Sequence, residues 1–362
     1  MIKTVNSFYH HNYLFEDDKE TYGFLASDIY TSVASGIKTE TQMKKDREND
    51  DEFTYLMESL NIWLGESEDS LFSYEMFNNQ QVLTTGFVPT PNFLPFPQRK
   101  KKNRINIISM DIAVSSGTDN DNTVFILGYY DKKLKKRGVE YIRAYNGLNS
   151  LTQVTLLKRL FYDYGCDYAV IDTKGIGNVF YDVMTVPTND DDRFMVYPAW
   201  TVCGDDNLQI SSDKVIQDKI QRTITQDASQ VVIPIAGTPE INSNVHLSLR
   251  KNLKDHKIEF LKDESEMEIL LAEDEDWVFK SSEERADILL PYVETRIMVN
   301  ESISLKQKMT SGGIGVVEDR DATKDRYMAV GYFNHFCDKL ENKYSKEENE
   351  SDEDLLNLQL VW

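Results

Sequence analysis

Three strand-like runs, an amphipathic helix and a further apolar run follow one another in the middle of the chain. The three runs are rich in β-branched and aromatic residues and are joined by short polar turns, which predicts consecutive strands of a meander. They occupy residues 105–113, 122–131 and 138–147. Because the turns are short, the three strands are expected to be neighbours in one sheet.

The next segments predict a crossover to a parallel strand. Residues 150–165 carry apolar side chains at helical spacing, between a capping Ser150 and a terminal Gly165. Residues 167–177 begin with an apolar run of the kind found in a parallel strand that is buried on both faces. The chain thus reads as an α/β protein whose mixed central sheet is flanked by helices.

Two later segments extend this pattern. Residues 195–202 are expected to form another strand, and residues 211–226 are expected to form a helix. The apolar side chains of that helix are spaced four residues apart and are Ile216, Ile220 and Ile224. With a further helix that residues 174–177 open, the full order is β-β-β-α-β-α-β-α.

The composition suggests three regions along the chain. Residues 1–100 read as a mainly helical segment, with a helix expected from Phe53 to a terminal Gly65, and they end in a proline-rich connector. Residues 101–340 hold the predicted sheet, and residues 341–362 form an acidic tail that reads as solvated or disordered. No GxxxxGK[ST] phosphate loop occurs, which argues against a P-loop ATPase.

The formal net charge of −21 and the cysteine content limit the possible binding partners and the cellular compartment. A strongly acidic chain does not bind nucleic acid through its overall charge, so any such contact requires local basic patches or bound cations. Three scattered cysteines, without CxxC spacing, favour a reducing compartment over a disulfide framework or a zinc cage. No stretch is apolar enough for a membrane span or a signal peptide, so a soluble, intracellular protein without a membrane partner is expected.

Asp111 and Asp172 occupy matching positions, because each ends an apolar strand. Ligand sites lie at the carboxyl ends of parallel strands, and the crossover helix makes these two strands neighbours. Each aspartate alone is more often a turn residue or a helix cap. Side by side, however, the two carboxylates repel one another unless a cation lies between them. The pair therefore predicts a divalent metal site.

A third acid is expected from a later element. Asp325 opens a predicted helix, where its negative charge suits the helix dipole, and Asp321 is a plausible rival. Asp119 and Asp121 lie in the turn between the first two strands and are more typical of a polar hairpin turn. In the alternative reading, Asp121 reaches back as an auxiliary metal ligand.

An all-carboxylate site selects hard cations, so Mg²⁺ or Mn²⁺ is expected. Two such ions, about 3.5–4 Å apart, support phosphodiester cleavage by activating a water and stabilising the leaving oxygen.

Lys174, Gly175 and Gly177 open a helix and could contact a phosphate, although a GxG alone is weak evidence. Basic clusters at residues 99–104 and 132–137 could contact the DNA backbone. None of the five histidines adjoins a motif, so no general base is predicted.

The segments SMDIA, VIDTKGIG and KDRYMAV, in their β-β-β-α-β context, resemble the RNase H-like nuclease domain of the large terminase subunit of tailed bacteriophages. KDRYMAV is the most specific of the three, and the resemblance covers about residues 104–340. Residues 27–80 are similar to the segment that ends the terminase ATPase domain. The Walker elements of a complete terminase are missing, which predicts a truncated chain or a split gene without ATP hydrolysis.

The resemblance implies that Asp111, Asp172 and Asp325 are the catalytic metal-binding acids and that Asp121 is an auxiliary ligand. It implies an endonuclease that cuts concatemeric viral DNA at the start and end of packaging. The implied partners are double-stranded DNA, the small terminase subunit and the portal protein. The implied location is the cytoplasm of the infected host cell, with transient docking on the procapsid.

Two alternative functions stay open on the sequence. Another RNase H-like nuclease, of the resolvase or recombinase type, would share the three acids but not the upstream region. A non-catalytic interaction module would use the same acids for a structural metal or as helix caps.

Overall fold

The computed structural model describes residues 29–49, 70–89, 102–113, 122–173, 177–318 and 323–359. The chain divides into two compact units, Met1–Glu66 and Ser67–Trp362. The described residues of the first unit form the helices α2 (Ile29–Ala34) and α3 (Glu40–Asn49). The helix expected between Phe53 and Gly65 lies outside the described residues. The central sheet belongs to the second unit.

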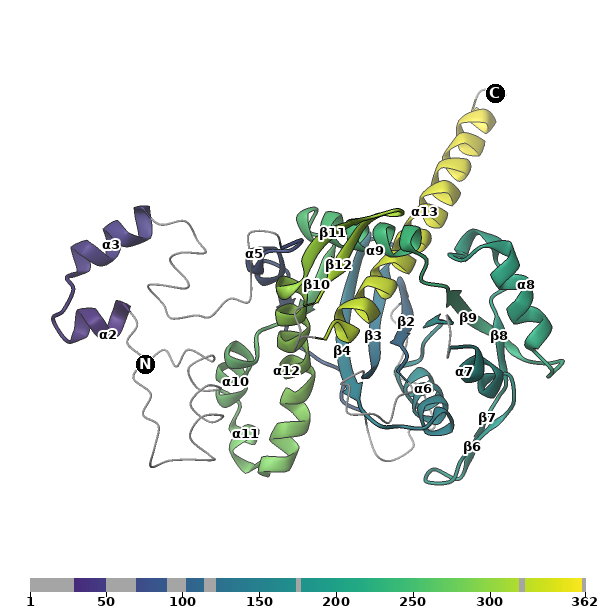
Figure 1. Cartoon of the computed structure of the whole chain (residues 1–362), viewed down its shortest axis with the longest axis horizontal. Coiled ribbons are helices and arrows are strands. Elements are labelled where there is room, and N and C mark those ends of the chain that lie inside the picture. The colour runs from purple at the N-terminus through teal and green to yellow at the C-terminus, as the bar shows by residue number, and fades with distance from the viewer. Residues whose placement is uncertain are drawn as a thin grey trace. The chain divides into compact units, whose positions relative to one another are not determined.

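Within the described residues, eight strands form one mixed sheet (Figure 1). In spatial order they are β1 (Gln81–Leu83), β10 (Ile258–Leu261), β4 (Lys136–Tyr145), β3 (Thr123–Asp131), β2 (Arg104–Asp111), β5 (Tyr168–Asp172), β9 (Ser229–Ile235) and β8 (Trp200–Val202). β2, β3 and β4 pair antiparallel, and the remaining pairs are parallel. The meander and the parallel β5 confirm the predicted α/β fold class with its RNase H-like mixed sheet.

Helices cover both faces of this sheet. They are α6 (Ser150–Tyr164), α7 (Gly177–Met184), α8 (Asp213–Arg222), α9 (Pro239–Lys254), α12 (Ser282–Ser304) and α13 (Asp325–Gln359). Side chains of β2 alternate between two apolar cores, as the period of a strand requires. Ile105 and Ile107 pack with α9, α12 and α13, whereas Ile108 and Met110 pack with α6 and α7.

The crossover helix α6 ends where the sequence predicts and begins one residue away from the predicted cap. Gly165 adopts the left-handed conformation at φ 70°, which confirms it as the C-terminal cap. At the other end, the side chain of Asn149 accepts from the backbone N–H of Thr152. Asn149, not Ser150, is therefore the N-cap. Both residue types are good caps, so local sequence does not decide between them.

α13 packs across the strands of the meander (Figure 1). A Cβ on Gly128 would lie 2.4 Å from the carbonyl oxygen of Gly138 and 2.7 Å from a ring carbon of Phe333. The backbone of β3 and the aromatic ring of α13 therefore meet because Gly128 leaves the space open. This close approach packs the third turn of α13 against the middle of β3.

The predicted helix over residues 211–226 is shorter than expected. α8 ends at Arg222, so Ile224 lies beyond it and is 75% exposed, and Ile220 is 45% exposed. Of the three isoleucines, Ile216 alone is buried, and Ile224 lies outside the helix because the backbone becomes extended at Thr223. The strand expected over residues 195–202 is present as two short strands, β7 (Met195–Tyr197) and β8.

Several elements of the second unit have no counterpart among the predicted segments. They include β1, β9, α9, β10 and α12, together with α5 (Tyr74–Asn78), β6 (Thr188–Asp190), the 3₁₀ helix η2 (Asp206–Leu208), α10 (Glu264–Ala272), α11 (Glu275–Phe279), β11 (Lys306–Thr310) and β12 (Gly313–Val317). The acidic segment near the C-terminus is helical, because α13 continues to Gln359 through residues of good helix propensity. Among the helices of the described residues, none combines the length and apolarity that crossing a bilayer requires.

Candidate active site

Asp111 and Asp172 lie at the same edge of the sheet. β2 and β5 are parallel neighbours in which Met110 pairs with Ile171, and each strand ends at the following aspartate. The two carboxylates consequently occupy adjacent strand ends, as the crossover predicted. Both side chains are partly buried.

Asp325 comes from a part of the chain that is distant in sequence from the other two acids, and it lies at the same edge of the sheet. It is the first residue of α13, and its Oδ2 accepts a 2.8 Å hydrogen bond from the backbone N–H of Asn122. Asn122 directly precedes β3, in which Val124 pairs with Asp111. The start of α13 is thereby fixed beside the end of β2, and the three predicted acids come together.

The proximity of the three acids is visible in the pKa of Asp111, which is raised well above its usual range. Burial is the largest cause, followed by the negative charges of Asp172 and then Asp325. Lys324 and a hydrogen bond from the backbone of Ile112 act in the opposite direction. The like charges are therefore close enough to destabilise one another's ionised form.

A tyrosine hydroxyl connects the second acid to the same helix. Tyr332 donates a 3.3 Å hydrogen bond to Oδ2 of Asp172. It lies two helical turns after Asp325, so both side chains project from one face of α13. Burial, with the charges of Asp172 and Asp111, raises the pKa of Tyr332 well above its usual range, which keeps the hydroxyl protonated as a donor.

The backbone that follows Asp111 is held from two other elements. Thr123 Oγ1 accepts from the backbone N–H of Ala113 at 3.1 Å and donates to its carbonyl oxygen at 2.9 Å. Gln153 of α6 donates to the same carbonyl oxygen at 2.9 Å. These bonds restrain the exit of β2 and thus the orientation of Asp111.

Several predicted site residues lie outside the described residues. They are Asp119, Asp121, Lys174, Gly175 and Asp321. Gly177 is described as the first residue of α7, so a helix does open there. Among the residues that the structure does describe, no set of three or more histidine, cysteine, aspartate or glutamate side chains is already arranged as a metal site.

His246 is a buried histidine that contacts Tyr327 of the KDRYMAV segment. Its Nδ1 lies 2.6 Å from the hydroxyl of Tyr327, and their rings are stacked. Burial, and secondarily Lys324, lowers its pKa to about 4. His246 is therefore a neutral core residue at physiological pH.

Two residues that support the site were not among the predicted ones. Asn122 opens the predicted second strand, and only the pairing of β3 with β2 shows that it faces Asp325. Tyr332 was visible in the sequence as a residue seven positions after Asp325, which is the spacing of one helix face. That spacing is a usable signal, although it does not reveal the bond to Asp172.

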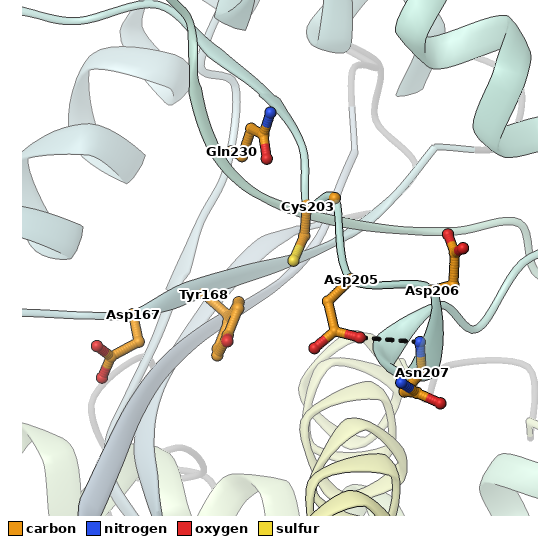
Figure 2. A pocket seen from close by; sticks show the side chains of 8 residues that line it. Asp167, Tyr168, Cys203, Asp205, Asp206, Asn207 and Gln230 are labelled. Atoms are coloured by element: carbon orange, nitrogen blue, oxygen red, sulfur yellow. Dashed lines mark hydrogen bonds between the residues drawn. The ribbon is translucent and has the colours of Figure 1, made fainter.

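A separate cavity of about 700 Å³ lies at the other end of β5 (Figure 2). Its lining residues are Asp167, Tyr168, Cys203, Gly204, Asp205, Asp206, Asn207 and Gln230. Asp205 accepts from the backbone N–H of Asn207 and pairs with Lys343 of α13 at 2.6 Å. Because Tyr168 begins the strand that Asp172 ends, this cavity is distinct from the cluster of acids.

Fold and site together define an α/β protein that gathers three aspartates at the carboxyl edge of an RNase H-like sheet. No family model and no curated protein sequence matches the chain. Solved structures of large terminases are similar to it.

The large terminase nuclease from the thermophilic phage G20c with bound magnesium is 14% identical, over 74% of this chain and 97% of that one, with a TM-score of 0.38. The HK97 bacteriophage large terminase is 8% identical, over 91% of this chain and 60% of that one, with a TM-score of 0.39. The nuclease domain of the large terminase subunit gp2 of bacterial virus Sf6 is 8% identical, over 66% of this chain and 89% of that one, with a TM-score of 0.35.

Proposed function

We propose that this chain is a divalent-metal-dependent DNA endonuclease of the RNase H-like type. The observation that carries the proposal is the convergence of Asp111, Asp172 and Asp325, which come from distant parts of the sequence and interact at one edge of the sheet. A fold gains nothing from placing three carboxylates together in a partly buried position unless a cation offsets their repulsion.

The donor set fits a hard cation. All three side chains offer carboxylate oxygens, which Mg²⁺ and Mn²⁺ prefer over softer ligands. Two such ions, when bound, would supply the activated water and the charge stabilisation that phosphodiester hydrolysis requires. The protein's own contribution is to position the acids: Asn122 restrains Asp325 and Tyr332 restrains Asp172.

The substrate in this proposal is double-stranded DNA, cut in concatemeric form during viral genome packaging. The motif resemblance to phage terminases supports this role, with the small subunit and the portal protein as partners in the host cytoplasm and at the procapsid. Asp121 is proposed as an auxiliary ligand. Lys174, Gly175 and Gly177 are proposed to contact a phosphate beside the site.

The proposal predicts metal-dependent nicking of supercoiled plasmid DNA. Cleavage should occur with Mg²⁺ or Mn²⁺ and stop in EDTA. Replacement of any one of the three aspartates should reduce the nicking rate by more than roughly 100-fold, because each replacement removes the charge of a metal ligand. The variants are Asp111→Asn, Asp172→Asn and Asp325→Asn. The exposed Asp227→Asn is the matched control and should cut at the wild-type rate.

The outcomes separate the competing functions. Folded protein that cuts no DNA with either metal would refute the nuclease and favour an interaction module. Cleavage of branched DNA in strong preference to linear duplex would favour a resolvase. Equal activity of wild type and all three aspartate variants would assign the cleavage to a contaminant.

A further inference from the structure

The first turn of α13 is not capped by the side chain of its N-cap residue. The carbonyl oxygen of Lys324 accepts the first helical hydrogen bond, from the backbone N–H of Met328 at 2.8 Å, so Lys324 occupies the N-cap position. A lysine side chain has no hydrogen-bond acceptor and cannot satisfy the free N–H groups of the first turn. Those donors therefore bond either to water or to a side chain of another residue.

Glu301 of α12 supplies that partner. Its Oε2 accepts from the backbone N–H of Arg326 at 3.0 Å and of Tyr327 at 3.2 Å. Its Oε1 accepts from Thr323 Oγ1 at 2.9 Å and from Arg326 Nη1 at 2.7 Å. Glu301 is only 7% exposed, so water does not compete strongly for these bonds.

This arrangement changes what Asp325 can do. An aspartate in the first turn of a helix ordinarily turns back to accept the free N–H groups of that turn. Here Glu301 already holds two of those donors, and Asp325 accepts from the backbone of Asn122 instead. The cap from α12 thus leaves the carboxylate of Asp325 directed toward the acid cluster.

The same helix also pairs with Arg326, the arginine that follows Asp325. Arg326 Nε donates to Glu294 at 2.6 Å, and its Nη1 donates to Glu301. Both glutamates come from α12 and are nearly buried. The guanidinium is therefore paired with two carboxylates of α12, and of these Glu301 alone also accepts from the backbone of α13 in the described structure.

We infer that Glu301 is a positioning residue for the metal site: it caps α13 from the neighbouring helix and thereby keeps Asp325 available beside Asp111 and Asp172. This inference rests on the proposed metal-dependent function. It assigns a functional role to a residue that lies outside the three sequence motifs.

The test compares substitutions on the same face of α12. Glu301→Ala removes the cap, and Glu301→Gln keeps its shape and a weaker, neutral acceptor. Glu294→Gln is the matched control, because Glu294 contacts Arg326 but receives no hydrogen bond from the backbone of α13 in the described structure. Binding of Mn²⁺ is measured by calorimetry, thermal unfolding is measured in EDTA, and plasmid nicking is measured with saturating Mn²⁺.

Glu301→Ala should weaken Mn²⁺ binding by about 10- to 100-fold, as loss of a supporting residue around a metal does. Glu301→Gln should weaken it less, and Glu294→Gln should bind Mn²⁺ as the wild type does even if its unfolding temperature falls. Saturating Mn²⁺ should restore much of the nicking rate of Glu301→Ala.

Wild-type Mn²⁺ affinity in folded Glu301→Ala would overturn the inference. If Glu301→Ala does not fold, equal Mn²⁺ affinities for Glu301→Gln and Glu294→Gln would overturn it. In both cases the proposed nuclease stands as long as the wild type binds Mn²⁺ and nicks DNA. A wild type that neither binds Mn²⁺ nor nicks DNA would instead refute the proposed function.

Discussion

At the scale of single residues, the surroundings decide the chemistry of a side chain. His246 and Asp111 are both titratable groups in the interior of the second unit, and burial shifts the pKa of each toward its neutral form. His246 meets a tyrosine hydroxyl, which is compatible with a neutral ring. Asp111 lies near two further carboxylates, and a bound cation would offset their repulsion.

The buried His246 predicts a defined loss of stability in mild acid. Its pKa is about 4 in the folded protein, against 6.5 when exposed, so the unfolded chain binds the proton first as the pH falls through 6.5. Above pH 6.5 the neutral His246 makes its full contribution to the free energy of unfolding. That contribution is lost progressively as the pH falls from 6.5 to about 4. Between pH 7 and pH 5 it amounts to roughly 2 kcal/mol.

The measurement is the free energy of unfolding by urea at pH 7 and pH 5. His246→Asn should show a decrease between the two pH values that is smaller than the wild-type decrease by roughly 2 kcal/mol. His256→Asn is the control, because His256 is exposed and its φ of 53° suits asparagine. The explanation is wrong if His246→Asn and the wild type lose equal stability on acidification.

At the scale of elements, the site depends on how closely α13 approaches the sheet and α9. Gly128 leaves room for Phe333, and a Cβ on Gly331 would lie 2.6 Å from Cγ1 of Val245. At both glycines a side chain of the neighbouring element occupies the space that a Cβ would fill. The helix that carries Asp325 and Tyr332 is therefore set in position by contacts beyond the site itself.

Gly128→Ala should destabilise the protein by about 1–3 kcal/mol, because the added methyl group overlaps a backbone carbonyl and an aromatic ring. The displaced α13 should also weaken Mn²⁺ binding. Gly147→Asn provides the control, since Gly147 has a φ of 71°, which asparagine tolerates, and open space around its Cα. Urea unfolding and calorimetry measure both effects, and unchanged stability of Gly128→Ala would show that α13 does not require this close contact.

At the scale of the whole molecule, a segment before the meander completes the sheet. β1 pairs with β10, and the backbone N–H of Leu71 donates to the carbonyl oxygen of Leu305. Leu71, Phe72 and Phe77 are almost fully buried in the core that also contains α13. Residues 70–89 therefore belong to the folding unit that carries the candidate site.

Two truncations test this assignment. The fragment of residues 67–362 should unfold cooperatively at the temperature of the complete chain's second unit, because it keeps the whole core. The fragment of residues 102–362 should be less stable by several kcal/mol or insoluble, because burial of three large apolar side chains contributes roughly 1.5–3 kcal/mol each. Thermal unfolding of both fragments decides the point, and equal stability would place the boundary of the unit near residue 100.

The sequence by itself determined the local features of the site. Apolar runs predicted β2 and β5 with an aspartate at the end of each, and the spacing of apolar residues predicted a helix that begins at Asp325. These features follow from periodicity and from residue preferences at the ends of elements, which act over a few neighbouring residues. The order of the elements then placed β2 beside β5.

The tertiary structure alone decided how these features meet. The N-cap of α13 comes from Glu301, the bond that orients Asp325 comes from Asn122, and the edge strand β1 comes from a segment that precedes the meander. Each is a contact between residues that are distant in the chain and have no mutual spacing to read. The physical reason is that a buried donor or acceptor must find a partner in space, and only the packed fold determines which residue that is.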